Sequence, residues 1–175
     1  MIVAMSLSVG TFAQKINWVS FEEALALQKK NPKKIMMDVY TNWCGPCKML
    51  DKNTFQNADV AKYVNDNYYA VKFDAEGNEV IKYKGNTYNN KGFRAEMANR
   101  RNSVHDLTHA LQVNAYPTVV FFDEKGDMIF PLKGYQQPQQ LELYLKMFGD
   151  DKHKEMKTQE DFNAYYSSFK PQFKG

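Results

Sequence analysis

The sequence predicts an α/β domain in which a central mixed β-sheet is flanked by helices, and three observations predict it. Helical and strand patterns alternate along the chain from Lys15 onward. A nearly continuous apolar run at residues 35–40 is typical of a strand buried on both faces, as in a parallel sheet. Two β-prone runs around a tight turn at residues 124–127 indicate an antiparallel hairpin. With 175 residues, the chain can bury one sizeable core but not two.

Composition excludes several classes of protein. The 23 Lys and Arg residues exceed the 20 Asp and Glu residues by too little to indicate a nucleic-acid partner. No apolar window reaches the roughly 18 residues of a membrane-spanning helix, so we expect no span in the mature chain. The two cysteines, only three residues apart, would close a loop too small to stabilise a fold much. We therefore expect them to serve chemistry rather than structure.

Residues 1–13 have features of an export signal. They are apolar and rich in small residues, and Thr11 and Ala13 occupy the two small positions before a signal-peptidase cut, which we place before Gln14. Since no Lys or Arg precedes the apolar stretch, either Met1 is an internal methionine or the leader is unusual. The alternative is a first β-strand or a tail, although Ser, Gly and Thr disfavour a strand. We expect a periplasmic or otherwise exported protein, with a cytoplasmic one as the alternative.

The first half of the domain alternates helices and strands. Ser20 and Glu23 have capping-box spacing at the start of a helix that Asn31-Pro32 ends. Asp38 is an acid within the first apolar strand. The predicted elements are a helix over residues 20–31, a strand over 35–40, a helical stretch after residue 48, a helix over 57–67 and a strand over 68–74.

The second half begins with a long surface excursion at residues 75–102, punctuated by glycines and asparagines and locally basic. We expect its Tyr83 and Tyr88 to be solvated. Pro131 indicates that the returning strand of the hairpin lies at a sheet edge. The predicted elements are a helix capped by Ser103 and running to about residue 112, strands over 119–122 and 128–132, and a helix with Pro138 in its first turn.

The domain is predicted to span residues 14–148, with a charged linker and a helix over residues 149–175. Thr158 with Asp161 begins that helix. Its aromatic residues follow an amphipathic spacing: Phe162, Tyr165, Tyr166 and Phe169. The helix either packs back on the domain, which we favour, or docks a partner.

The residues that carry chemistry lie at positions 43–48, between a strand and a helix. A thiolate attacks a disulfide, so one cysteine needs a lowered pKa. Cys44 at the helix start would lie where N–H groups and the helix dipole stabilise negative charge, so we expect it to attack. Cys47, one turn in and more buried, would resolve. Gly45 relieves crowding at the turn, and Pro46 pre-sets the backbone for helix entry.

The segment Trp43-Cys-Gly-Pro-Cys-Lys48 resembles the active-site motif of the thioredoxin family. The resemblance implies a thioredoxin fold over about residues 16–148, and Asp38 matches the family's buried aspartate, which accepts or relays the proton of the resolving cysteine. From the residues alone, an acid on a doubly buried strand should have a raised pKa and be a useful proton acceptor. The alternative for Asp38 is a hydrogen-bonded core acid with no catalytic duty.

The segment Tyr116-Pro117-Thr118 resembles the family's cis-proline loop, which offers backbone hydrogen bonds to an extended substrate. We expect Trp43, Gly45 and Pro46 to contact substrate as well. The chain departs from a minimal thioredoxin in the insertion within residues 75–102 and in having Tyr116 where an aliphatic residue is usual. Lys72 lies near the position of the family's buried lysine.

We therefore expect a thiol-disulfide oxidoreductase that reduces protein disulfides through Cys44 and Cys47. It would be a monomer without cofactor or bound metal, and would draw electrons from a membrane thiol carrier. One alternative is a non-catalytic binding or chaperone-like module that uses the insertion and the tail. Another is a Cys2His2 zinc site with His105 and His109, whose spacings fit but which lie far from the cysteines in sequence.

Overall fold

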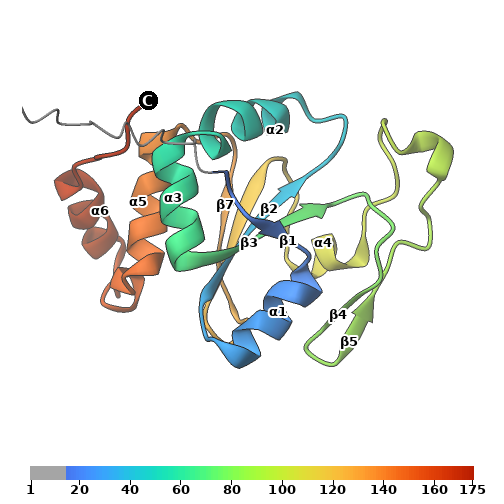
Figure 1. The fold of residues 1–175 in the computed structure, drawn as a ribbon, viewed down its shortest axis with the longest axis horizontal. Coiled ribbons are helices and arrows are strands. Elements are labelled where there is room, and N and C mark those ends of the chain that lie inside the picture. Colours follow the sequence, from blue (N-terminus) through green and yellow to red (C-terminus); the bar gives the residue numbers. More distant parts are fainter. Residues whose placement is uncertain (1–14) are drawn as a thin grey trace, which may run out of the picture.

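A five-stranded mixed sheet forms the centre of the protein, as the sequence predicts (Figure 1). The computed structural model describes residues 15–175. In the strand order β1-β3-β2-β6-β7, β3 runs parallel to β1 and β2, whereas β6 is antiparallel to β2 and β7. The strands are β1 (Trp18–Val19), β2 (Lys34–Tyr40), β3 (Tyr68–Asp74), β6 (Thr118–Phe122) and β7 (Met128–Lys133). Pro131 lies in the edge strand β7, as predicted.

Helices cover both faces of this sheet (Figure 1). The apolar side chains of α1 and α4 form one core cluster with Ile35, Met37 and Val39 of β2, and those of α3 and α5 form the other with Met36. Asp38 lies on the same side of the alternating strand as Met36. The helices are α1 (Phe21–Lys30), α2 (Gly45–Leu50), α3 (Ala58–Asn67), α4 (Asp106–Ala110), α5 (Pro138–Gly149) and α6 (Gln159–Ser168).

Local signals explain most of the helix boundaries. The Ser20 hydroxyl caps α1, the Asn57 side chain caps α3, and Thr158 with Asp161 forms a capping box on α6. The predicted start of α4 is wrong, because His105 and not Ser103 caps it: its Nδ1 accepts the Leu107 N–H at 3.0 Å. Sequence patterns favour small hydroxyl caps, and only the fold shows that this ring is buried beside the helix end.

The chain between β3 and α4 is more ordered than the predicted surface excursion. It contains a hairpin, β4 (Ile81–Tyr83) and β5 (Asn86–Tyr88), that packs near α1 at the right of Figure 1. The expectation of a solvated Tyr83 is wrong, since its ring is buried against Phe21 and Phe122 and its hydroxyl donates to the Gly126 carbonyl. The hairpin therefore extends the hydrophobic core.

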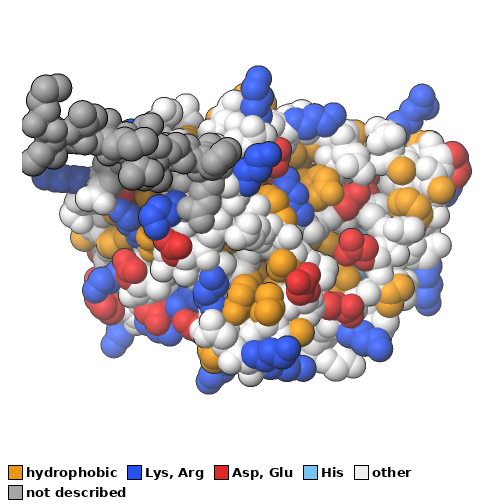
Figure 2. All heavy atoms as spheres, in the orientation of Figure 1, with side chains coloured by type: hydrophobic (Ala, Val, Ile, Leu, Met, Phe, Trp, Pro, Cys, Tyr) orange, Lys and Arg blue, Asp and Glu red, His pale blue; other side chains and the backbone are white. Residues whose placement is uncertain are grey.

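The C-terminal segment packs back on the domain, which is the alternative that the sequence favours. Met156, Phe162, Tyr165 and Phe173 are partly buried against the core cluster of α3 and α5. Charged side chains of both signs are interspersed on the face shown in Figure 2. Among residues 15–175, no helix has the length and apolarity to cross a membrane. The predicted leader, residues 1–13, lies outside the described residues.

Candidate functional site

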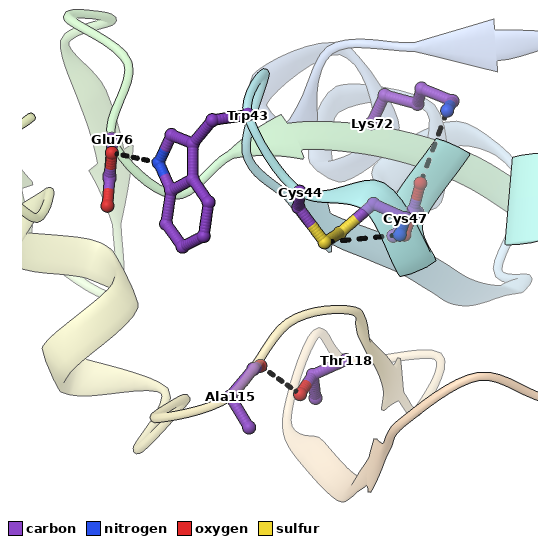
Figure 3. The surroundings of a disulfide bond; sticks show 8 residues. Trp43, Cys44, Cys47, Lys72, Glu76, Ala115 and Thr118 are labelled. Atoms are coloured by element: carbon purple, nitrogen blue, oxygen red, sulfur yellow. Dashed lines mark hydrogen bonds and ion pairs between the residues drawn. A yellow bond between two sulfur atoms is a disulfide. The ribbon is translucent and has the colours of Figure 1, made fainter. Parts of the chain in front are cut away.

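Cys44 and Cys47 form a disulfide where the chain passes from β2 into α2 (Figure 3). Cys44 is the N-cap of α2, and its Sγ accepts the Cys47 backbone N–H at 3.1 Å. Pro46 lies in the first turn, where its fixed φ suits helix entry and its missing N–H is not needed. An N–H aimed at the Cys44 sulfur favours the thiolate at this position once the bond is reduced.

The two cysteines face different surroundings. We expected Cys47 to be the more buried, but both are nearly inaccessible, with 3% of Cys44 and 5% of Cys47 exposed. Cys44 lines an open groove of about 670 Å³, together with Gly45 and Pro46. Cys47 instead lines a smaller cavity with Lys72 and Asp51. The side on which each sulfur lies, rather than its exposure, therefore distinguishes the two residues.

In the wall of this cavity, Lys72 bridges two carboxylates. Its Nζ lies 3.2 Å from Asp38 Oδ2 and 2.6 Å from Asp51 Oδ1. Asp38 is 1% exposed, and its Oδ1 has no partner among the described residues. Desolvation raises the pKa of Asp38 to about 6, against the opposing attraction of Lys72. Burial would lower the pKa of Lys72, but the attraction of both carboxylates raises it overall. Asp38 is thus a buried carboxyl group whose pKa lies closer to neutral than that of an exposed aspartate.

The opposite side of the groove is the loop before β6. The Tyr116–Pro117 peptide bond is cis, as the resemblance implies. The Thr118 hydroxyl donates to the Ala115 carbonyl at 2.8 Å, which fixes the turn across from the cysteines in Figure 3. Pro117 and Thr118 are buried, whereas Ala115 and Tyr116 line the groove with Cys44. Tyr116 also meets Trp43 edge-on, with ring centroids 6.2 Å apart.

Trp43 is held by residues from both ends of the insertion. Its indole N–H donates to Glu76 Oε2 at 2.8 Å, the contact drawn in Figure 3, and the same oxygen accepts the Asn102 backbone N–H at 2.7 Å. The Arg101 guanidinium lies over the indole ring, with its central carbon 4.8 Å from the centroid. The insertion therefore packs directly beside the cysteine pair.

The residues that sequence reasoning missed all lie outside the motif. Glu76, Arg101 and Asp51 each contact a predicted site residue or its partner, yet none has a local pattern that marks it. Lys72 carried a signal, since it alternates within a strand and lies near the family's lysine position, and the structure pairs it with Asp38.

In the part of the chain that the structure describes, the histidines of the zinc hypothesis do not form a metal-binding group with the cysteines. Both ring nitrogens of His105 are engaged, Nδ1 by the Leu107 N–H and Nε2 by the Glu79 carbonyl at 2.8 Å. His109 is exposed at the groove. Within residues 15–175, no three His, Cys, Asp or Glu side chains are grouped as a metal site requires.

The sequence is similar to those of known proteins. Thiol:disulfide interchange protein DsbD of Pectobacterium atrosepticum is 27% identical over 139 residues, 78% of this chain and 20% of that protein. The chain thus spans about a fifth of the length of this relative. Thioredoxin-like protein slr0233 of Synechocystis is 26% identical over 78% of this chain and 98% of its own.

Solved structures share the fold. A thioredoxin-fold protein from Helicobacter pylori matches with a TM-score of 0.59 and 21% identity, covering 78% of this chain and 84% of that one. The model of the thioredoxin-like domain family matches residues 21–149, which include the cysteine pair, the buried acid and the cis-proline. The chain therefore belongs to the thioredoxin-like domain family.

Proposed function

We propose that the protein is a thiol-disulfide oxidoreductase that reduces protein disulfides. The observation that carries this proposal is the Cys44–Cys47 disulfide at the start of α2, between a groove on the Cys44 side and a buried acid–lysine pair on the Cys47 side. A groove beside one sulfur gives a substrate disulfide a place to bind. At the other sulfur, Lys72 lines the cavity with Cys47 and pairs with Asp38, which offers a route for the proton of Cys47.

The reaction follows from this division of roles. In the reduced protein, the Cys44 thiolate attacks one sulfur of the substrate disulfide, and the other substrate sulfur leaves as a thiolate that takes a proton from water. Asp38 accepts the proton of the Cys47 thiol, directly or through water in the cavity. The Cys47 thiolate then attacks Cys44 and displaces the second substrate thiol. One substrate disulfide becomes two thiols, and the protein dithiol becomes a disulfide.

The reducing direction requires a supply of electrons. Export is supported by the leader-like sequence at residues 1–13. Outside the cytoplasm, a membrane protein that carries a dithiol would return the Cys44–Cys47 disulfide to the reduced state. The name of the DsbD relatives, thiol:disulfide interchange protein, supports exchange chemistry of this class.

The first experiment is the reduction potential of the cysteine pair, measured by equilibrating the protein in defined thiol buffers and trapping free thiols. A value near or below about −240 mV supports a reductase, and a value above about −150 mV reverses the direction to disulfide formation. A pair that never oxidises and carries stoichiometric zinc contradicts the proposal altogether.

A second experiment separates catalysis from simple binding. The Cys44→Ser variant should lose all disulfide reductase activity, because the attacking sulfur is gone. If this variant still prevents aggregation of a partner as well as the wild type does, and the wild type shows no reductase activity, the protein is a binding module instead.

A further inference from the structure

The two charged side chains of the groove beside Cys44 differ in their access to solvent. Among the described residues that line the groove, they are Arg101 and Glu76. Glu76 is only 7% exposed, and its Oε2 already accepts two N–H groups, from Trp43 and Asn102. Little of its negative charge therefore faces a ligand, whereas Arg101 is an exposed residue.

The guanidinium N–H donors of Arg101 are available to a ligand. Across residues 15–175 no carboxylate lies within ion-pair distance of its guanidinium, and no hydrogen bond uses it. A guanidinium has five N–H donors in a rigid fork that matches a carboxylate. The contact with the Trp43 ring holds the side chain by a cation–π attraction and leaves these donors available.

The position of Arg101 relates it to the reacting bond. Trp43 directly precedes Cys44, and Arg101 lies over its ring at the wall of the same groove. A substrate polypeptide with one sulfur at Cys44 occupies this groove, so acidic side chains close to its cysteine come within reach of Arg101. The insertion, at the right of Figure 1, supplies Arg101 just before α4.

We propose that Arg101 is a specificity-determining residue that binds an Asp or Glu carboxylate beside the substrate's disulfide. The preferred substrates are then polypeptides with acidic residues next to the reacting cysteine. This inference rests on the proposed reductase function and adds no chemical step to it.

The test uses two synthetic peptides with the same internal disulfide, which differ only in having Glu or Gln on both sides of the reacting cysteine. Reduction of each by the reduced protein is followed as kcat/KM, and each value is divided by the rate with a small dithiol to remove intrinsic reactivity. We expect the Glu peptide to be preferred by about two- to five-fold, the range of an exposed ion pair. The preference should fade at 1 M salt, where screening acts within about 3 Å.

Arg101→Gln should bring the ratio for the two peptides to one. Arg100→Gln is the matched control. Arg100 is the neighbouring residue, carries the same charge and is exposed, but its side chain does not line the groove. This variant should keep the preference. Equal ratios in the wild type and Arg101→Gln overturn the inference, and an equal loss in Arg100→Gln shows a general charge effect and overturns it too.

The outcomes also separate the two proposals. If the wild type reduces the Gln peptide without preferring the Glu peptide, only the role of Arg101 fails. If it reduces neither peptide, the reductase function fails and the inference falls with it. The reduction potential and thermal unfolding of Arg101→Gln should match those of the wild type, which shows that the site remains intact.

Discussion

The raised pKa of the single residue Asp38 predicts how the reaction depends on pH. Its pKa of about 6 means that below pH 6 it holds a proton and cannot accept the one from Cys47. In single-turnover experiments with a peptide disulfide, the resolving step should accelerate as pH rises through about 6 and then level off.

Asp38→Asn should slow that step by at least about ten-fold at pH 7, the lower part of the range for general-base catalysis, and remove the inflection. An unchanged pH profile in this variant would show that Asp38 is a core acid without a catalytic duty.

The burial that raises the pKa of Asp38 also lowers the stability of the folded protein at neutral pH. The pKa of Asp38 is raised from 3.8 to about 6 in the folded protein, so folding becomes less favourable as pH rises through this interval. A shift of about two units corresponds to ~3 kcal/mol above pH 6. Asp38→Asn should therefore stabilise the oxidised protein by about 1–3 kcal/mol at pH 7, and by much less at pH 3.5, where Asp38 is protonated in the folded state and mostly protonated in the unfolded state. Urea unfolding at the two pH values measures this difference.

We expect Glu76 to contribute to the stability of the fold as well as to the position of Trp43. Glu76→Ala removes the acceptor of two N–H groups, from Trp43 and Asn102, and should destabilise the protein by about 1–3 kcal/mol. Glu76→Gln keeps one oxygen acceptor and should lose less. Urea unfolding of both variants tests this, and equal losses would mean that the charge rather than the hydrogen bonds matters.

At this scale, local sequence identified the cysteines and the buried acid, because an acid in an apolar strand and a cysteine at a helix start each have a chemical reason that can be recognised along the chain. The proline whose peptide bond is cis was predicted only from the resemblance to the thioredoxin family. Arg101 and Glu76 could not be found in this way, because they reach Trp43 only through the path of the insertion. Their roles depend on tertiary contacts that no spacing encodes.

At the scale of elements, prediction succeeded where packing and capping agree. β2 and β3 were found within a residue of their ends, because their apolar patterns match their buried positions. The β4–β5 hairpin was missed, since its strands have three residues each and Gly85 and the asparagines around them favour turns. The start of α4 was misplaced because its cap is a buried histidine.

The C-terminal tail offers a prediction for one element. Glu142, in α5, is fully buried, and its carboxylate accepts the backbone N–H groups of Gln172 and Phe173 at 2.8 Å and pairs with Lys146. Deleting residues 171–175 removes two of these partners and should destabilise the protein by about 1–3 kcal/mol in urea unfolding.

The same deletion in a Glu142→Gln background should cost less, because the charge that the tail satisfies is gone. Equal costs in the two backgrounds would assign the effect to the other contacts of the tail rather than to the carboxylate. These are the packing of Phe173 on Tyr63 and the backbone hydrogen bonds of Lys174 with Asn57 and Asp59.

At the scale of the whole molecule, the tail and the insertion occupy opposite ends (Figure 1). The groove beside Cys44 has no lining residue from α6 or from the tail. The deletion of residues 171–175 should therefore leave the reduction potential of the cysteine pair and kcat/KM for both peptides unchanged at a temperature where the protein stays folded. A changed potential would show that the tail influences the cysteine pair, although it contributes no residue to the groove.

The insertion is closed at its base. The side-chain amide of Asn90 donates to the Gly77 carbonyl at 3.0 Å and to the Ser103 carbonyl at 2.7 Å, so the two ends of the excursion are joined to one point. The entropy of closing a loop grows only slowly with its length, so loop closure alone would let a segment tied in this way change in length at little cost. Its hairpin, however, buries Ile81 and Tyr83 in the core cluster of Phe21 and Phe122, and replacing the whole segment would remove part of the core. Changes in length should therefore be tolerated best between Asn90 and Arg101, where no residue is buried, and there they would reshape the wall of the groove without disturbing the sheet.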